Sequence, residues 1–230
     1  MSVGNLLKAF CLIAVSYAVS GCDPDEIRIS MNVSDIVKAQ NGEEAYARAK
    51  IVYSTMGMDD EDDKAKLERC RNVAQKYVGK NGRVKIVKDE FKTGIDARFK
   101  IPIFNSSKPC RFSLNPPLNM VIDKNCTMLY LHEEEGVVDR LNADLSRAAD
   151  MVEAGFVGKT SFVIHNDTEH SFSFDVIGAF VDGEAVLTKR VVLAEDEECE
   201  IMFPRKNGEN HVYNKINPRI INFKIVNGQK

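Results

Sequence analysis

The feature that most constrains the fold is an alternation of hydrophobic and polar residues with a period of two near the C-terminal end. It runs through residues 160–193 and is interrupted by an Asn-Asp pair at 166–167 and an Asp-Gly pair at 182–183. Two more alternating stretches follow, EIMF at 200–203 and NPRIINFKIV at 217–226. Successive side chains of a strand point to opposite faces, and both dipeptides favour hairpin turns. We therefore predict several short strands that form a β-sandwich.

The preceding residues mix two kinds of periodicity. Residues 26–33 and 45–53 alternate as half-buried strands do, whereas residues 59–78 and 137–152 carry hydrophobic residues at a spacing of three and four, which indicates helices. Four further short strands are expected at 84–87, 95–103, 118–122 and 127–131. Because proline cannot donate a backbone hydrogen bond, Pro102 predicts that its strand lies at an edge or ends there.

Together these patterns predict an α+β protein with three parts. We expect an α+β domain over residues 26–133, a connecting helix within residues 134–157 and an all-β domain over residues 158–230. The turns of the last part resemble those of small immunoglobulin-like modules that bacterial surface proteins append to other domains. This resemblance implies an immunoglobulin-like sandwich. A single continuous α+β domain stays open, because the helix at 137–152 could pack on either sheet.

The first 21 residues have the pattern of an export signal. Lys8 supplies positive charge, and residues 9–19 form an apolar stretch. A helix that spans a bilayer needs about 20 apolar residues, so this stretch is too short for a permanent membrane anchor. We therefore exclude residues 1–21 from the predicted fold.

The residues behind that stretch are Val19, Ser20, Gly21 and Cys22. They resemble the lipobox of bacterial lipoprotein precursors. The resemblance implies that the Cys22 thiol takes a diacylglycerol, that the peptide is cut before Cys22, and that the new amino group is acylated. Two or three acyl chains would hold the protein on the membrane far more firmly than one chain does. An ordinary secretory signal that ends in a cysteine by chance is the alternative.

The residue after the lipobox cysteine bears on the location. In enterobacterial lipoproteins, an aspartate at the position of Asp23 resembles the signal that retains the protein at the inner membrane. We therefore expect a lipid-anchored protein of the bacterial envelope that faces the periplasm, at the inner membrane in preference to the outer one. Residues 22–25 would form the lipidated N-terminus and a short linker.

Four cysteines follow the lipobox, namely Cys70, Cys110, Cys126 and Cys199. An even number of cysteines in an oxidising compartment predicts two disulfides, and three pairings are possible. Our first choice joins Cys110 to Cys126 across a short loop and leaves Cys70 to pair with Cys199. A zinc site is disfavoured because none of these cysteines has the C-x₂-C or C-x₄-C spacing.

Other patterns suggest sites but lack the residues that the chemistry needs. The GFVGKTSF stretch at 155–162 is not a phosphate-binding loop, because Glu153 stands where that loop needs glycine. The DDEDD stretch at 59–63 fits the N-terminus of a helix better than a calcium site. His165 and His170 flank a turn without an identifiable third metal ligand. We predict neither a metal nor a cofactor.

Composition narrows the class of function. A formal net charge of −3 disfavours nucleic acid as a partner. No serine or cysteine nucleophile motif is present, and we expect no enzymatic activity. We predict a binding or structural module of the envelope, with a protein partner bound through an exposed strand edge of the C-terminal sheet. An inhibitor or exclusion factor against an incoming enzyme or mobile element is the alternative, and a lipid or small-ligand carrier is a further one.

Overall fold

The computed structural model describes residues 24–56, 61–80, 82–88, 92–107, 117–123, 128–149, 159–203 and 219–223. Its strands are β1 (Pro24–Asn32), β2 (Tyr46–Met56), β3 (Arg83–Lys88), β4 (Lys92–Asn105), β5 (Leu118–Ile122), β6 (Met128–Glu133), β7 (Lys159–His165), β8 (Phe172–Val181), β9 (Glu184–Leu193), β10 (Glu198–Phe203) and β11 (Arg219–Phe223). Its helices are α2 (Val33–Gln40), α3 (Glu61–Val78) and α4 (Glu135–Ala149).

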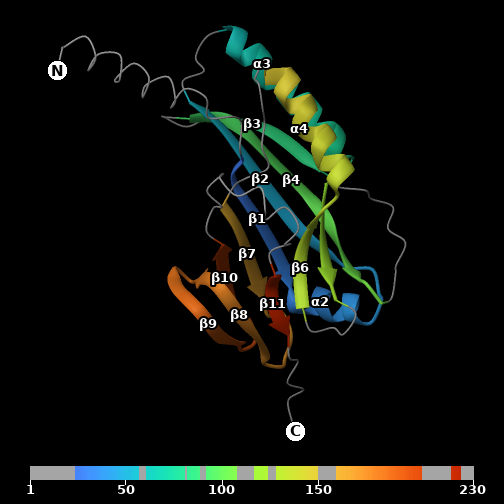
Figure 1. Ribbon diagram of the computed structural model, residues 1–230, viewed down its shortest axis with the longest axis vertical. Coiled ribbons are helices and arrows are strands. Elements are labelled where there is room, and N and C mark those ends of the chain that lie inside the picture. The colour runs from blue at the N-terminus through green and yellow to red at the C-terminus, as the bar shows by residue number, and fades with distance from the viewer. Residues whose placement is uncertain are drawn as a thin grey trace, which may run out of the picture.

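All eleven strands belong to one sheet, which curls into a half-barrel (Figure 1). The strand order is β10-β7-β1-β2-β4-β5-β6-β11-β8-β9, with β3 added to β4, and β10 also pairs with β8. Most neighbours are antiparallel, but β1 pairs with β7 in parallel, as β4 does with β5. The β1–β7 contact therefore joins the first described strand to one that lies more than 130 residues later in the chain.

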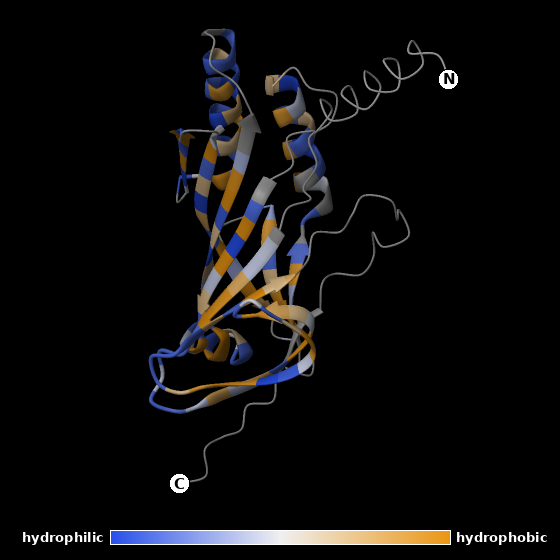
Figure 2. Ribbon diagram, turned by 90° about the vertical axis from the view of Figure 1, so that its left-hand side faces the viewer, coloured by the Kyte–Doolittle hydropathy of each residue, from blue (hydrophilic) through white to orange (hydrophobic). Residues whose placement is uncertain are grey.

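The core lies on the inner face of this curled sheet. Along β1, the side chains of Ile27, Ile29 and Met31 are buried, and the intervening positions point to the other face. Figure 2 shows the same alternation of hydrophobic and hydrophilic residues along the long strands. All three helices contribute to this one core, as Ile36 of α2 and Leu67 of α3 illustrate. The opposite, outer face of β1, β2 and β4 carries the polar side chains.

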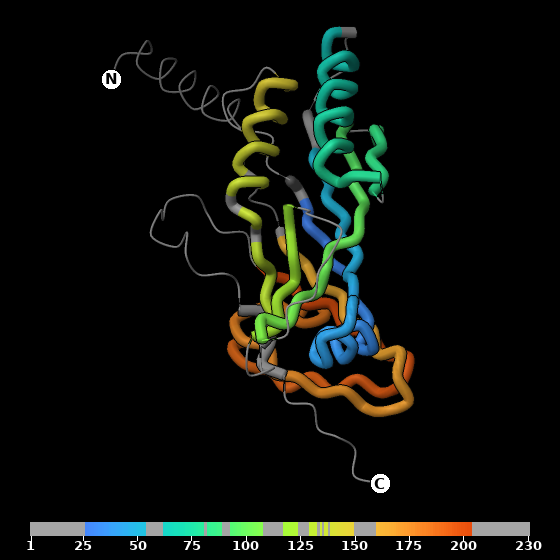
Figure 3. Tube along the Cα trace, turned by 90° about the vertical axis from the view of Figure 1, so that its right-hand side faces the viewer, coloured from blue at the N-terminus to red at the C-terminus, as the bar shows by residue number. Residues whose placement is uncertain are grey.

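Helices α3 and α4 lie side by side at one end of the molecule, and β8 and β9 lie at the other (Figure 3). The Tyr77 hydroxyl of α3 donates to the Asp144 carboxylate of α4 at 2.8 Å. The Arg69 guanidinium donates to the backbone carbonyl of Ala148 at 3.0 Å. These polar contacts fix how the two helices lie against each other beyond what their apolar faces require.

A buried asparagine joins the two turns that flank β8 and β9. The Asn166 side chain is fully buried, and its Nδ2 donates to the backbone carbonyls of His170, Leu193 and Ala194 at 2.9–3.0 Å. Its Oδ1 accepts from the backbone N–H and the hydroxyl of Thr168. A buried amide with satisfied hydrogen bonds specifies one arrangement of these turns, because only a side-chain amide offers both N–H donors and a carbonyl acceptor.

The next residue ties the β7–β8 turn to α2. Helix α2 has no side-chain hydrogen bond from its own N-cap residue, Asn32. The carboxylate of Asp167 instead accepts from the Ser34 backbone N–H at 2.9 Å and from the Ser34 hydroxyl at 2.6 Å. An N–H of the first helical turn has no partner within the helix, so this contact supplies one from a distant part of the chain.

The structure confirms the α+β class and most of the predicted elements. The helix predicted at 59–78 is α3, the one at 137–152 is α4, and the strand at 118–122 has the predicted bounds. Pro102 lies within β4, not at its end. It occupies the gap between the pairing of β3, which stops at Arg98, and that of β5, which begins at Ile103. A missing donor is tolerated at that point.

The division into separate domains does not coincide with a break in the sheet. The hairpin predicted at the Asp-Gly pair 182–183 is found, because β8 pairs with β9 there. The Asn-Asp pair at 166–167 does not make a hairpin, since β7 pairs with β1 and β10 and not with β8, and β11 pairs with β6. These pairings place the predicted parts 26–133 and 158–230 in one sheet and agree with the alternative of a continuous α+β domain. Alternation within a strand defines its buried face and carries no information about its neighbour.

The predicted disulfide between Cys70 and Cys199 is wrong. Both side chains are buried, and they are not bonded to each other. Cys70 lies on α3, whereas Cys199 lies on β10 beside Ile164 of β7. Burial, helped by the nearby carboxylates of Asp182 and Glu198, raises the pKa of the Cys199 thiol to about 12. Cys22, Asp23, Cys110 and Cys126 lie outside the described residues.

We predict that replacing Asp167 with alanine lowers the free energy of unfolding by about 1 kcal/mol at pH 7, through loss of the α2 cap. Partial burial raises the pKa of Asp167, but the Ser34 hydrogen bonds outweigh it, and the pKa lies below 3.8. The contribution is therefore present above pH 4 and is lost as the pH falls through the lowered pKa. Urea unfolding at pH 7 and pH 3 measures this difference.

The control for this variant is Glu169→Ala, which removes an exposed carboxylate from the same turn. We expect it to change stability by less than about 0.5 kcal/mol. Equal effects of the two substitutions, or an Asp167→Ala effect that grows at low pH, would contradict the capping role.

Candidate functional site

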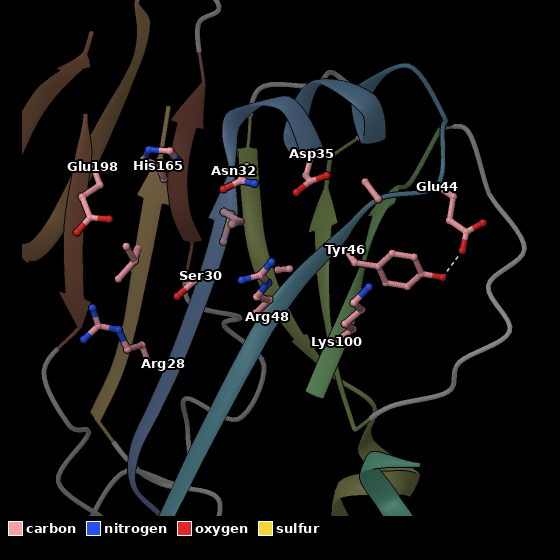
Figure 4. A pocket seen from close by; sticks show the side chains of 14 residues that line it. Arg28, Ser30, Asn32, Asp35, Glu44, Tyr46, Arg48, Lys100, His165 and Glu198 are labelled. Atoms are coloured by element: carbon pink, nitrogen blue, oxygen red, sulfur yellow. Dashed lines mark hydrogen bonds between the residues drawn. The ribbon is translucent and has the colours of Figure 1, made fainter. Parts of the chain in front are cut away.

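A polar hollow lies on the outer face of the sheet, where it crosses β7, β1, β2 and β4 (Figure 4). We call it the basic groove. Its volume is about 490 Å³. It is lined by Arg28, Ser30, Met31, Asn32, Asp35, Glu44, Ala45, Tyr46, Ala47, Arg48, Lys100, Val163, His165 and Glu198. A second hollow of about 410 Å³ adjoins it and shares Arg28, Ser30, Arg48 and Lys100.

The strand register explains why these side chains meet. Ser30 of β1 lies opposite Arg48 of β2, and Arg48 lies opposite Lys100 of β4, so the three form one row across the sheet. The inner positions beside them, such as Ala47 and Ile101, are fully buried. Because the side-chain period of a strand is two, burial of these positions forces Arg48 and Lys100 outward.

The next row across the same strands contains three cations, and each has a carboxylate partner. The pairs and their N–O distances are Arg28–Glu200 at 3.3 Å, Lys50–Glu26 at 3.5 Å and Arg98–Asp96 at 2.8 Å. The last pair has three N–H···O contacts, and the Asp96 side chain is only 10% exposed. The positive charge of this row is therefore locally balanced.

The row that contains Arg48 and Lys100 is different. Within the part of the chain that the structure describes, neither cation forms an ion pair with a carboxylate, and both side chains are exposed. The Lys100 ammonium lies 5.8 Å from the centre of the Tyr46 ring, within range of a cation–π contact. Like charges directly opposite on neighbouring strands repel each other, so the Arg48–Lys100 pair lowers the stability of the fold. In the adjacent row, the carboxylate partners offset this repulsion.

The other end of the groove holds groups of the opposite charge. Asp35 lies 3.6 Å from the Lys38 ammonium, and the Tyr46 hydroxyl donates to Glu44. His165 and Glu198 are opposite each other on β7 and β10. Among the described residues, no three histidine, cysteine, aspartate or glutamate side chains cluster as metal ligands do. The groove thus offers charge and hydrogen-bond donors to a ligand, concentrated at Arg48 and Lys100.

The sequence-based candidates lie elsewhere or only border the groove. His165 lines it, whereas His170 lies in the β7–β8 turn, where its carbonyl accepts from Asn166. A further histidine, His132, lies on β6 with its ring 3.9 Å from the Glu134 carboxylate and does not line the groove. Lys159 begins β7; it belongs to the stretch 155–162, which the sequence excluded as a phosphate-binding loop. Residues 61–63 of the acidic stretch form the first turn of α3.

The basic groove was not predicted from the sequence. Its signal is present, since the similar stretches A-R-A-K at 47–50 and A-R-F-K at 97–100 place cations at alternate positions of two strands. That pattern shows which face the cations occupy. It does not show that the two strands are neighbours in the register that places Arg48 opposite Lys100.

Comparison with known proteins gives a family and no activity. The sequence pattern of a family described as Domain of unknown function (DUF7424) matches residues 25–204. The chain belongs to the DUF7424 family. No curated protein matches it. The DUF7424 segment extends from β1 through β10, so it contains every strand of the basic groove and crosses the boundary predicted between residues 133 and 158.

We predict that Arg48→Gln raises the free energy of unfolding by about 0.5 kcal/mol at low salt, because it removes the charge opposite Lys100. Arg98→Gln is the matched substitution in the balanced row and should lower stability by about 1 kcal/mol, because it leaves the nearly buried Asp96 without its partner. Denaturant unfolding of both variants at 20 mM and 500 mM NaCl measures this. A lower free energy of unfolding for Arg48→Gln would contradict this prediction, because it would show that the charge of Arg48 stabilises the fold.

Proposed function

We propose that this DUF7424 protein is a bacterial envelope lipoprotein, held at the membrane by acyl chains on Cys22 and facing the periplasm. The lipobox at 19–22 and the apolar stretch at 9–19 support this proposal. Asp23 favours the inner membrane over the outer one. No helix among the described residues is long and apolar enough to cross a membrane. Strand β1 begins at Pro24, so the lipid would be attached almost directly to the sheet.

At the membrane, the protein acts as a non-catalytic binding module, and the basic groove is its binding surface. The observation that carries this assignment is the Arg48–Lys100 pair, two exposed cations opposite each other that have no carboxylate partner among the described residues. An anionic ligand would supply the missing negative charge. Binding by a lipid-anchored module concentrates the ligand at the membrane surface.

A second candidate is an inhibitor or exclusion factor that binds a protein from outside the cell. Strand β9 favours it, because among the described strands β9 pairs only with β8. Leu187 and Val192 on this strand are 89% and 58% exposed. An exposed edge can accept a strand from a partner, as we expect for an immunoglobulin-like segment.

We predict that Cys22→Ser abolishes fatty-acid labelling and leaves the precursor uncut, because serine lacks the thiol that takes the lipid. Cys11→Ser, within the signal, is the control and should be labelled and cut as the wild type is. Metabolic labelling followed by mass spectrometry of the N-terminus provides the measurement. A labelled and processed Cys22→Ser protein would refute the lipid anchor.

A further inference from the structure

We propose that the basic groove binds the phosphomonoester group of its ligand between Arg48 and Lys100. This inference rests on the proposed binding role of the groove and names the chemical class of the ligand. Three properties of the site support it, namely the amount of unbalanced charge, the arrangement of hydrogen-bond donors and the space around them.

The charge of the site matches a phosphomonoester better than a carboxylate or a phosphodiester. Arg48 and Lys100 together carry two positive charges, whereas Arg28, Lys50 and Arg98 in the next row are already paired. A phosphomonoester carries about −1.5 to −2 at pH 7, but a carboxylate or a phosphodiester carries −1. Of these three anions, only the monoester brings enough negative charge to balance both cations.

The donors of the row match the oxygens of a phosphate. The planar guanidinium of Arg48 can hold two oxygens at once, and the Lys100 ammonium acts as a compact charge with three donors. Ser30, half-buried, completes the row on the β1 side and adds a hydroxyl. Figure 4 shows all three residues along the floor of the groove. A phosphate group has three terminal acceptor oxygens, one more than a carboxylate can offer.

The space around this row indicates an organic ester in preference to inorganic phosphate. The groove has a volume of about 490 Å³ and continues into the adjoining hollow past Arg48. The Tyr46 ring lies beside Lys100 and offers a flat apolar surface to the group that carries the phosphate. The ligand therefore has a polar or ring-shaped body, as a sugar phosphate has.

Two sources can present this group, a soluble phosphate ester and the headgroup of a phosphorylated lipid. A strand rises about 3.3 Å per residue, so Ser30 lies about 20 Å along β1 from Pro24, next to the proposed lipid attachment. A headgroup in the same membrane reaches Arg48 only when the sheet lies flat on the bilayer. This distance favours the soluble ester.

The test is calorimetric titration of the full-length chain in detergent with glucose 1-phosphate, glucuronate and dimethyl phosphate at fixed ionic strength. We expect glucose 1-phosphate to bind at least tenfold more tightly than the other two. Arg48→Gln and Lys100→Gln should each weaken that binding tenfold or more. Lys85→Gln, which removes an exposed cation of β3 outside the groove, should leave it unchanged.

The pH dependence provides a second readout that a general effect on folding would not produce. The second ionisation of a phosphomonoester has a pKa of about 6, so its affinity should rise several-fold between pH 5 and pH 7. Glucuronate is the reference, because its carboxyl group is already ionised over this range and its affinity reports any change in the titratable groups of the groove, namely His165, Asp35, Glu44 and Glu198. The ratio of the two affinities should therefore rise several-fold. Circular dichroism of every variant confirms that the fold is intact.

Vesicles distinguish the two sources of the phosphomonoester. Phosphatidylcholine vesicles that contain phosphatidic acid present a monoester, and those that contain phosphatidylglycerol present a diester. Binding of the Cys22→Ser chain to phosphatidic acid alone, lost in Arg48→Gln, identifies a lipid headgroup as the ligand. Binding of glucose 1-phosphate without vesicle binding identifies a soluble ester. Either result supports the phosphomonoester.

The failing outcomes separate this inference from the function on which it rests. Equal affinities for glucose 1-phosphate and glucuronate would overturn the phosphomonoester and leave an anion-binding groove. Absence of binding by every anion, with the fold intact, would overturn both the inference and the binding role of the groove. Neither outcome bears on the lipid anchor, which the labelling of Cys22 tests separately.

Discussion

The rest of the structure depends on the parallel pairing of β1 with β7. Residues 26–32 lie in continuous register with residues 159–165, and this contact joins segments that are more than 130 residues apart in the chain. The hydrogen bonds between Ser34 and Asp167 extend the contact beyond the ends of both strands. Without this pairing, β7 and β10 would connect to β2 and β4 only by the longer path through β8, β11, β6 and β5.

The basic groove follows from the same pairing. Its floor crosses β7, β1, β2 and β4, and the register between these strands places Val163, Ser30, Arg48 and Lys100 in one row. The adjacent row shows that the sheet can balance its cations, since Arg28, Lys50 and Arg98 all have carboxylate partners there. A fold that leaves two opposed cations without such partners gives up some stability at that site. Binding of an anion restores the balance, which is why we assign function to this row.

Local periodicity predicted most of the helices and strands. It did not predict which distant strands pair with each other. Leu67 and Leu145 fall on the buried faces of helices that their spacing predicted, and Ile27 and Ile29 fall on the predicted face of β1. The neighbour of β1 could not be predicted, because alternation is compatible with any partner strand. The domain boundary expected between residues 133 and 158 and the Cys70–Cys199 disulfide both depended on which distant segments are neighbours. Neither is found in the structure. The groove could not be predicted either, because it depends on the register between β1, β2 and β4.

The most direct test of this account is native-state hydrogen exchange of the full-length chain. Because β1 and β7 belong to one sheet, their amides should exchange through the same cooperative opening, with equal protection free energies and equal loss of protection in Asp167→Ala. If β7 to β10 instead exchange as a unit of their own while β1, β2 and β4 keep their protection, the molecule contains two independent domains. The side of the groove that β7 and β10 form would then lose its structural basis.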